Sequence, residues 1–156
     1  MEHALVIIKP DGVQRKLIGR ITNRIEEKGL LIVGLKMSFI SKELASKNYA
    51  VHKGKDFYKP LIRYMTSSPV VLMAVKGINA IKITRKLTGT TFGQDAEPGT
   101  IRGDYAISNR FNLIHCSDSP EAAEREIKLF FEDYELLDYD TIDLNWIYDT
   151  SEGKYV

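Results

Sequence analysis

The chain has 156 residues, of which 44% are hydrophobic and 28% charged, with a formal net charge of +1. This composition is typical of a globular protein, and the length predicts one domain, residues 1–156, with a substantial core. No apolar run reaches the ~18 residues of a membrane span, and the N-terminus does not resemble a signal peptide. A single cysteine excludes an internal disulfide framework and a cysteine-based zinc cluster. We therefore expect a cytoplasmic protein without a membrane segment.

The charge is distributed unevenly along the chain. Residues 132–152 carry eight acidic residues and no Lys or Arg, which indicates an acidic C-terminal tail over about 132–156. Residues 1–131 hold 21 Lys and Arg against 13 Asp and Glu, a net charge of +8. A basic body suits a polyanionic ligand, either a nucleotide phosphate or a nucleic acid. A solvated surface without a ligand also explains this charge, and charge alone favours that interpretation.

The N-terminal part of the chain alternates between strand and helix patterns. The apolar run at 4–9 predicts a buried strand, and residues 9–12 predict a turn. Apolar residues recur at helical spacing from Ile18, and Gly29 is placed to end that helix. A second strand is expected over 30–40.

The middle of the chain predicts three helices and a strand. Ser41 can cap a short helix over 42–51, and a second short helix spans about 57–66. A third strand follows at 69–77. Residues 79–89 predict a helix with an asparagine cap at its first residue and a glycine stop at its last.

A long loop rich in Gly and Thr, residues 88–104, separates that helix from the last strand, expected over about 105–115. Loops of this length are often functional. Ser119 and Pro120 predict the N-cap and first residue of a final helix. This order of elements predicts an α/β (α+β) fold: a ferredoxin-like βαββαβ sandwich with a four-stranded antiparallel sheet, helices and a long loop.

Neither a Walker A pattern nor a Rossmann glycine fingerprint is present in the sequence, so a phosphate site must be built differently. His115 stands where the last strand is expected to end, just before a helix. A neutral imidazole, with an ordinary pKa near ~6.5, is a good nucleophile at pH 7 and can accept a phosphoryl group. A histidine held in a loop by a backbone carbonyl is the alternative, and position alone favours it.

Four further polar residues lie at strand ends or around the long loop: Lys9, Arg85, Thr91 and Arg102. Each by itself is best explained as a surface charge or a turn residue. Together they come from segments that can converge on the opening of one binding site. Phosphoryl transfer requires cations and donors arranged around the phosphoryl oxygens, which is what such a cluster supplies.

Several motifs resemble one known family. The segment "NLIHCSDS" (112–119) is similar to the N-x-x-H-[GA]-S-D signature of nucleoside diphosphate kinases. "KPDGVQR" (9–15), "GTIRGD" (99–104) and "WIYD" (146–149) resemble segments of that family in the same order. The resemblance covers residues 4–148, nearly the whole chain.

The resemblance implies a nucleoside diphosphate kinase that carries a γ-phosphate from a nucleoside triphosphate to a nucleoside diphosphate by a ping-pong route. His115 would be the phosphorylated nucleophile. Lys9 would reach the sugar 3′-hydroxyl and the transferring phosphate, so it counts as both catalytic and nucleotide-binding. Tyr49 would lie beside the reaction centre, and Glu126 and Ser117 would hold the imidazole.

The same resemblance implies the remaining nucleotide contacts. Arg85, Thr91 and Arg102 would bind the phosphates, Asn112 the sugar hydroxyl, and Phe57 would stack on the base. Stacking reads only a π face, so base selectivity should be weak. Mg²⁺ would bridge the substrate phosphates without protein ligands. We expect replacement of Arg102 to damage transfer more than folding.

The family assembles as hexamers or tetramers from a common dimer. The loop at 88–104 and the tail through Trp146 and Tyr148 resemble the hexameric kind, so a homohexamer is expected, with a tetramer as the alternative. A basic nucleic-acid-binding module is the rival function. No RNP1 aromatic pattern is found in the sequence, so nucleic acid is kept only as a secondary partner.

Cys116 departs from the family, which usually has Gly or Ala beside the histidine. Adjacent residues of an extended chain point to opposite sides, so Cys116 should face away from the substrate and pack as a weak hydrophobe. A redox switch is the alternative, and it would require an exposed thiol with a low pKa.

Overall fold

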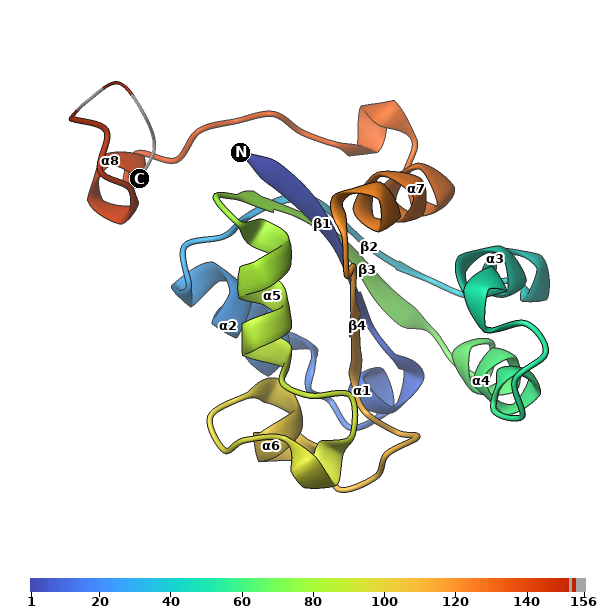
Figure 1. The fold of residues 1–156 in the computed structure, drawn as a ribbon. Coiled ribbons are helices and arrows are strands. Elements are labelled where there is room, and N and C mark those ends of the chain that lie inside the picture. The colour runs from blue at the N-terminus through green and yellow to red at the C-terminus, as the bar shows by residue number, and fades with distance from the viewer. Residues whose placement is uncertain (152, 154–156) are drawn as a thin grey trace.

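A four-stranded antiparallel sheet forms the centre of the molecule (Figure 1). The computed structural model describes residues 1–151 and 153. The sheet has the order β2-β3-β1-β4. The order of elements and the antiparallel pairing confirm the ferredoxin-like fold predicted from the sequence. The strands are β1 (Glu2–Ile8), β2 (Leu31–Ser38), β3 (Val70–Gly77) and β4 (Ile114–Cys116).

Helices cover both faces of this sheet. In Figure 1, α2 and α5 lie on one side of it, and α3, α4 and α7 lie on the other. The α-helices are α1 (Pro10–Gln14), α2 (Ile18–Glu27), α3 (Lys42–Asn48), α4 (Tyr58–Met65), α5 (Ala80–Thr88), α6 (Ile101–Tyr105), α7 (Pro120–Phe130) and α8 (Leu144–Ile147). Short 3₁₀ turns lie at η1 (Ala50–His52), η2 (Gly93–Asp95) and η3 (Asp133–Glu135).

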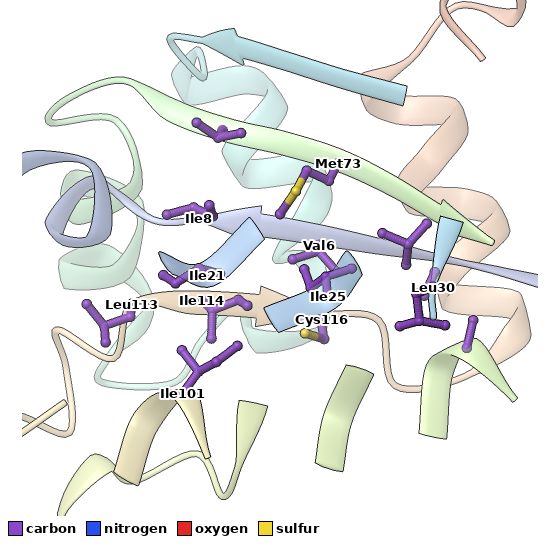
Figure 2. Close-up of a cluster of buried hydrophobic side chains, with 14 of the residues drawn as sticks. Val6, Ile8, Ile21, Ile25, Leu30, Met73, Ile101, Leu113, Ile114 and Cys116 are labelled. Carbon is purple, nitrogen blue, oxygen red and sulfur yellow. The ribbon is translucent and has the colours of Figure 1, made fainter. Parts of the chain in front are cut away.

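Strand β1 is buried on both faces, which explains its continuous apolar run. Its side chains alternate between two hydrophobic clusters, as the period of a strand requires. Val6 and Ile8 join the cluster beneath α2 and α5 (Figure 2), whereas Leu5 and Ile7 join the cluster beneath α3, α4 and α7. The residue that follows β1, Lys9, therefore lies at the end of an inner strand that is covered on both faces.

The predicted helix ends are mostly confirmed. Ser41 and Ser119 each accept a backbone N–H bond at 3.1 Å as N-caps, and Pro120 is the first residue of α7. Gly29 and Gly89 follow the ends of α2 and α5 with positive φ. Asn79 is the N-cap residue of α5, as predicted, but it has a left-handed φ of 52° and its side chain makes no cap bond.

The predicted strand over 105–115 was wrong in most of its length. Only Ile114–Cys116 pair with β1, and Tyr105 is the last residue of α6. Leu113 has a φ of 70°, which a β-strand does not allow, so the chain turns into the sheet only after it. The side chain of Leu113 is nevertheless fully buried, which explains the misleading apolar pattern.

Two segments predicted to be irregular contain short helices. The turn at 9–12 opens α1, because Pro10 is favoured at the first position of a helix. The loop 88–104 contains η2 and the start of α6, with Thr100 as N-cap of α6 through a 3.0 Å bond from the Gly103 N–H. Arg102 therefore lies on a helix, not in an open loop.

The acidic segment after α7 runs back along the sheet. Lys36 lies 2.5 Å from Glu135, and Lys76 lies 2.5 Å from Asp138, so part of the tail pairs with basic residues of its own chain. Residues 152 and 154–156 of the predicted tail lie outside the described residues. Trp146 of α8 is 91% exposed. Within residues 1–151 and 153, no helix has the length and apolar character needed to cross a membrane.

Candidate active site

A pocket of about 640 Å³ opens beside the end of β1 and the start of β4. It gathers residues from distant parts of the chain. Ser117 and Glu126 do not line the pocket, but they bond to each other behind its wall. The lining includes eight of the residues singled out from the sequence: Lys9, Tyr49, Phe57, Arg85, Thr91, Arg102, Asn112 and His115.

His115 is held by one of its two ring nitrogens. It is the middle residue of β4, opposite Ile7 of β1, and its side chain is 19% exposed. Its Nε2 lies 3.1 Å from Oε1 of Glu126. The other oxygen of that carboxylate accepts a 2.6 Å bond from the Ser117 hydroxyl. Nδ1 is therefore the ring nitrogen that the carboxylate leaves for chemistry.

Glu126 is a buried carboxylate, 4% exposed, on α7. Burial raises its pKa, but the bonds from His115 and Ser117 outweigh burial and hold the pKa below its usual range. An ionised carboxylate can only accept, so the proton between Glu126 and His115 belongs to Nε2. The neutral imidazole then carries its free lone pair on Nδ1.

Local structure fixes this arrangement on both sides. The Leu5 N–H donates to the Ser117 hydroxyl oxygen at 3.0 Å, and the Ser117 N–H donates to the Leu5 carbonyl at 3.0 Å. The N-cap Ser119 then begins α7, which carries Glu126 back over β4 two turns later. The carboxylate and the imidazole are thus placed by a strand and a helix.

Lys9 is a buried cation on the pocket wall. It is 7% exposed, and its Nζ donates to Asn112 Oδ1 at 2.6 Å. Asn112 Nδ2 donates in turn to the Thr91 carbonyl at 2.8 Å. Burial and the nearby charge of Arg102 lower the pKa of Lys9 to about 7, against the opposing effect of Asp11. The free pocket therefore holds an ammonium that gains or loses its proton near neutrality.

Arg102 has a structural task that the sequence did not indicate. Its guanidinium is buried and directs four N–H groups at backbone carbonyls. Nε donates to Asn112 at 3.1 Å, Nη1 to Gly89 at 3.0 Å and Thr90 at 3.1 Å, and Nη2 to Ile114 at 2.6 Å. A guanidinium has five N–H groups, so one remains for a ligand.

A row of four rings runs along the pocket from its mouth to the nucleophile. The ring centroids of Phe57 and His52 are 5.3 Å apart, those of His52 and Tyr49 are 6.4 Å apart, and those of Tyr49 and His115 are 5.8 Å apart, with the last two rings edge to face. Phe57 is 48% exposed, so a face of its ring is open to a ligand.

Several lining residues were not among the site residues predicted from the sequence: His52, Phe92, Asn109, Arg110 and Asp118. His52 was noticed without a role. A signal existed, because His52 follows Tyr49 by three residues, and that spacing places two side chains on one side of a helical turn. Arg110 and Asn109 carry no comparable signal, because their segment was wrongly expected to be a strand.

Cys116 follows His115 on β4 and lines the same pocket, so the expectation that it would face away from the substrate was wrong. Its Sγ is 2.9 Å from the Thr88 hydroxyl oxygen, and the residue belongs to the cluster drawn in Figure 2. Burial raises the pKa of the thiol. The side chain is therefore a buried thiol with a hydroxyl partner, which agrees with the expected packing and not with an exposed, reactive thiolate.

Comparison with known proteins identifies the family. A family model for nucleoside diphosphate kinase matches residues 2–136. The nucleoside diphosphate kinase of Archaeoglobus fulgidus is 50% identical over 149 residues, covering 96% of this chain and 99% of that protein. That of Pyrococcus abyssi is 55% identical over 150 residues, covering 94% of each.

A solved structure agrees with these matches. The halophilic nucleoside diphosphate kinase from Halobacterium salinarum, in complex with CDP, superposes with a TM-score of 0.93 at 49% identity, covering 95% of this chain and 99% of that one. Sequence and fold therefore give the same answer over nearly the whole length, and the resemblance predicted from the motifs is confirmed. The chain belongs to the nucleoside diphosphate kinase family of phosphotransferases.

Proposed function

We propose that this chain transfers the γ-phosphate of a nucleoside triphosphate to a nucleoside diphosphate through a phosphohistidine at His115. The observation that carries the proposal is the bond of Nε2 to the buried carboxylate of Glu126, which leaves Nδ1 as the nucleophile. The Nδ1 lone pair forms a bond to the γ-phosphorus while the bond to the bridging oxygen breaks and the diphosphate leaves. A second diphosphate then attacks the phosphorus, and the N–P bond breaks.

The pocket supplies the electrostatics for this transfer. Its lining carries the basic side chains of Lys9, Arg85 and Arg102. Thr91 adds a hydroxyl group and its backbone polar groups to the same lining. Phosphoryl transfer is catalysed largely by such positioned charge. Lys9 and Asn112, which bond to each other, would bind the sugar hydroxyl.

The remaining predicted residues shape the pocket. Tyr49 packs edge-on against His115 and limits rotation of its ring. The half-exposed Phe57 offers a stacking face, which would read the π surface of a base and select weakly among bases.

Mg²⁺ fits this site as part of the nucleotide substrate. Among the described residues that line the pocket, Asp118 is the one carboxylate, whereas Mg²⁺ held by protein needs several oxygen ligands. The ion would bridge the substrate phosphates and offset their charge. Lys9, Arg85 and Arg102 would bind the phosphate oxygens that the ion leaves free.

The first prediction concerns the intermediate. After incubation with labelled nucleoside triphosphate and removal of nucleotide, the protein should retain one acid-labile, alkali-stable phosphoryl group, which a nucleoside diphosphate should discharge. His115→Ala should retain none, and the matched variant His3→Ala, outside the pocket, should retain it. A stable adduct on a serine or on Cys116 in the wild type would contradict the proposal.

The second prediction separates the two arginines. Arg102→Ala should lower kcat/KM by about 10²–10³, as loss of a preorganised donor does. It should also lower the free energy of unfolding by about 1–3 kcal/mol, because four backbone carbonyls lose their donors. This revises the expectation that folding would be spared. Arg85→Ala, on the exposed side of α5, should reduce kcat/KM while leaving the thermal midpoint near that of the wild type.

The third prediction follows from the pKa of about 7 for Lys9 in the free pocket. At about pH 8 part of the Lys9 population is neutral, and a bound phosphate favours the charged form. Binding of a nucleoside diphosphate should therefore take up protons. Calorimetry in two buffers of different ionisation enthalpy measures this uptake. Lys9→Arg, which stays charged, should abolish the Lys9 component, and equal uptake in both proteins would refute the assignment.

We further propose that the chain forms one catalytic domain in the cytoplasm, where its nucleotide substrates are held, and assembles as a homohexamer. Exposed apolar side chains support assembly, since surfaces of this kind mark interfaces. Trp146 is 91% exposed, and Ile107 is 80% exposed. Leu35 and Met37 of the edge strand β2 are also exposed, as is Phe39 just after it.

The fourth prediction tests that assembly. Light scattering should report the mass of six chains. A monomer would contradict the assembly proposal altogether, and a tetramer would contradict only the argument from the tail through Trp146 and Tyr148.

A further inference from the structure

Leu113 occupies an unfavourable backbone conformation in the middle of the active-site segment. Its φ of 70° lies in the left-handed region, where a non-glycine side chain crowds the backbone. Its neighbours are Asn112, which bonds Lys9, and Ile114, which leads to His115. The turn at Leu113 therefore sets the relative orientation of Asn112, the proposed sugar-binding residue, and His115, the proposed nucleophile.

The Ile114 N–H closes this turn on the Asn112 carbonyl at 2.8 Å, and Arg102 binds the carbonyls of Asn112 and Ile114. Asp11 makes the side-chain bond to Leu113 itself. The Leu113 N–H donates to Asp11 Oδ2 at 3.2 Å, and the Leu113 carbonyl accepts the Lys9 N–H at 2.8 Å. A side chain on Gly12 would come within 3.2 Å of the Leu113 carbonyl oxygen and 2.7 Å of Ile8. Glycine at this position lets α1 approach closely enough for the Asp11 carboxylate to reach Leu113.

Tyr64 of α4 holds the other oxygen of the same carboxylate. Its buried hydroxyl donates to Asp11 Oδ1 in a short hydrogen bond. Burial, reinforced by Asp11, raises the pKa of the phenol, so Tyr64 keeps its proton and remains the donor. Neither Asp11 nor Tyr64 lines the pocket. They reach the active site through Leu113, through the charge of the carboxylate, and through the edge-to-face contact of the Tyr64 ring with Phe111, whose ring centroids are 5.1 Å apart.

That charge acts on the two buried cations of the pocket. Asp11 raises the pKa of both Lys9 and Arg102. It opposes burial at both residues, the charge of Arg102 at Lys9, and the charge of Arg85 at Arg102. The other group that raises the pKa of Lys9 is Cys116. Asp11 is thus the carboxylate that supports the protonated form of Lys9 from behind the pocket wall.

We propose that Asp11 and Tyr64 are positioning residues for phosphoryl transfer: the carboxylate, clamped by the Tyr64 hydroxyl, fixes Leu113 in its left-handed turn and thereby sets Asn112, Lys9 and His115 for one nucleotide. The proposal rests on the proposed function. A displacement of about 1 Å at reacting groups can cost ~10²-fold in rate, so a small relaxation at Leu113 would be measurable.

The test uses the full chain with two substitutions of graded severity. Tyr64→Phe removes one bond to the carboxylate, and Asp11→Asn removes the charge while keeping the shape. The matched control is Tyr139→Phe, which deletes a hydroxyl bonded to the Ile32 carbonyl at 2.8 Å, away from the pocket. Single-turnover phosphorylation of His115 at saturating nucleoside triphosphate is measured well below each thermal midpoint.

Positioning predicts a rate constant lower by about 3–10-fold in Tyr64→Phe and about 10–100-fold in Asp11→Asn, with Tyr139→Phe unchanged. A purely structural role predicts lower thermal midpoints with wild-type rate constants in both variants, which would overturn the proposal. If Asp11→Asn does not fold, the rate constant of Tyr64→Phe still decides.

Proton uptake on binding of a nucleoside diphosphate gives an independent readout of the charge. The number of protons taken up on binding is measured against pH, and it should begin to rise near the pKa of Lys9 in the free protein. In Asp11→Asn this rising edge should move to lower pH, because Lys9 loses the carboxylate that favours its protonated form. In Tyr64→Phe the edge should stay in place. An unmoved edge in Asp11→Asn would overturn the charge contribution. A wild-type chain that forms no phospho-His115 would refute the proposed function itself, which is a different outcome from variants that match the wild type.

Discussion

The hydrogen bond between His115 and the buried carboxylate of Glu126 is the interaction on which the site depends. A buried carboxylate is stable only when its oxygens are satisfied, and here the imidazole and the Ser117 hydroxyl satisfy one oxygen each. The N-cap Ser119 begins the helix that carries Glu126, and the bond between Ser117 and Leu5 fixes Ser117 beside β1. Together they bring these groups into contact. The helix and the strand therefore fix both the ring orientation and the nitrogen that is free to react.

The opposite wall of the pocket has the reverse problem, because it concentrates positive charge. Lys9 and Arg102 are both buried, and each lowers the stability of the other's charged form. Backbone carbonyls around Arg102 and the Asp11 carboxylate offset part of this cost. The remaining positive charge is already arranged for a polyanion. A phosphate group would therefore neutralise these cations without requiring the pocket to rearrange.

The sequence predicted the architecture where one physical signal dominated. Apolar runs marked strands covered on both faces, and polar caps marked helix ends. It failed over 105–115, because burial of Leu113 mimics a strand while its backbone is left-handed and its N–H bonds to Asp11, a residue far away in the chain. The cluster around His115 was predictable from motif order. The structural role of Arg102 could not be predicted, because it depends on four backbone carbonyls that point at the guanidinium only in the folded chain.

In the proposed transfer, Glu126 reserves Nε2 of His115 and leaves Nδ1 to carry the phosphoryl group. Nuclear magnetic resonance of the isolated phosphoenzyme, with ¹⁵N-labelled histidine and phosphorus detection, distinguishes the two nitrogens directly. The structure predicts a phosphorus–nitrogen coupling to Nδ1 and a proton retained on Nε2. A phosphoryl group bonded to Nε2 would contradict it, because that nitrogen would have had to leave the carboxylate around which the site is built.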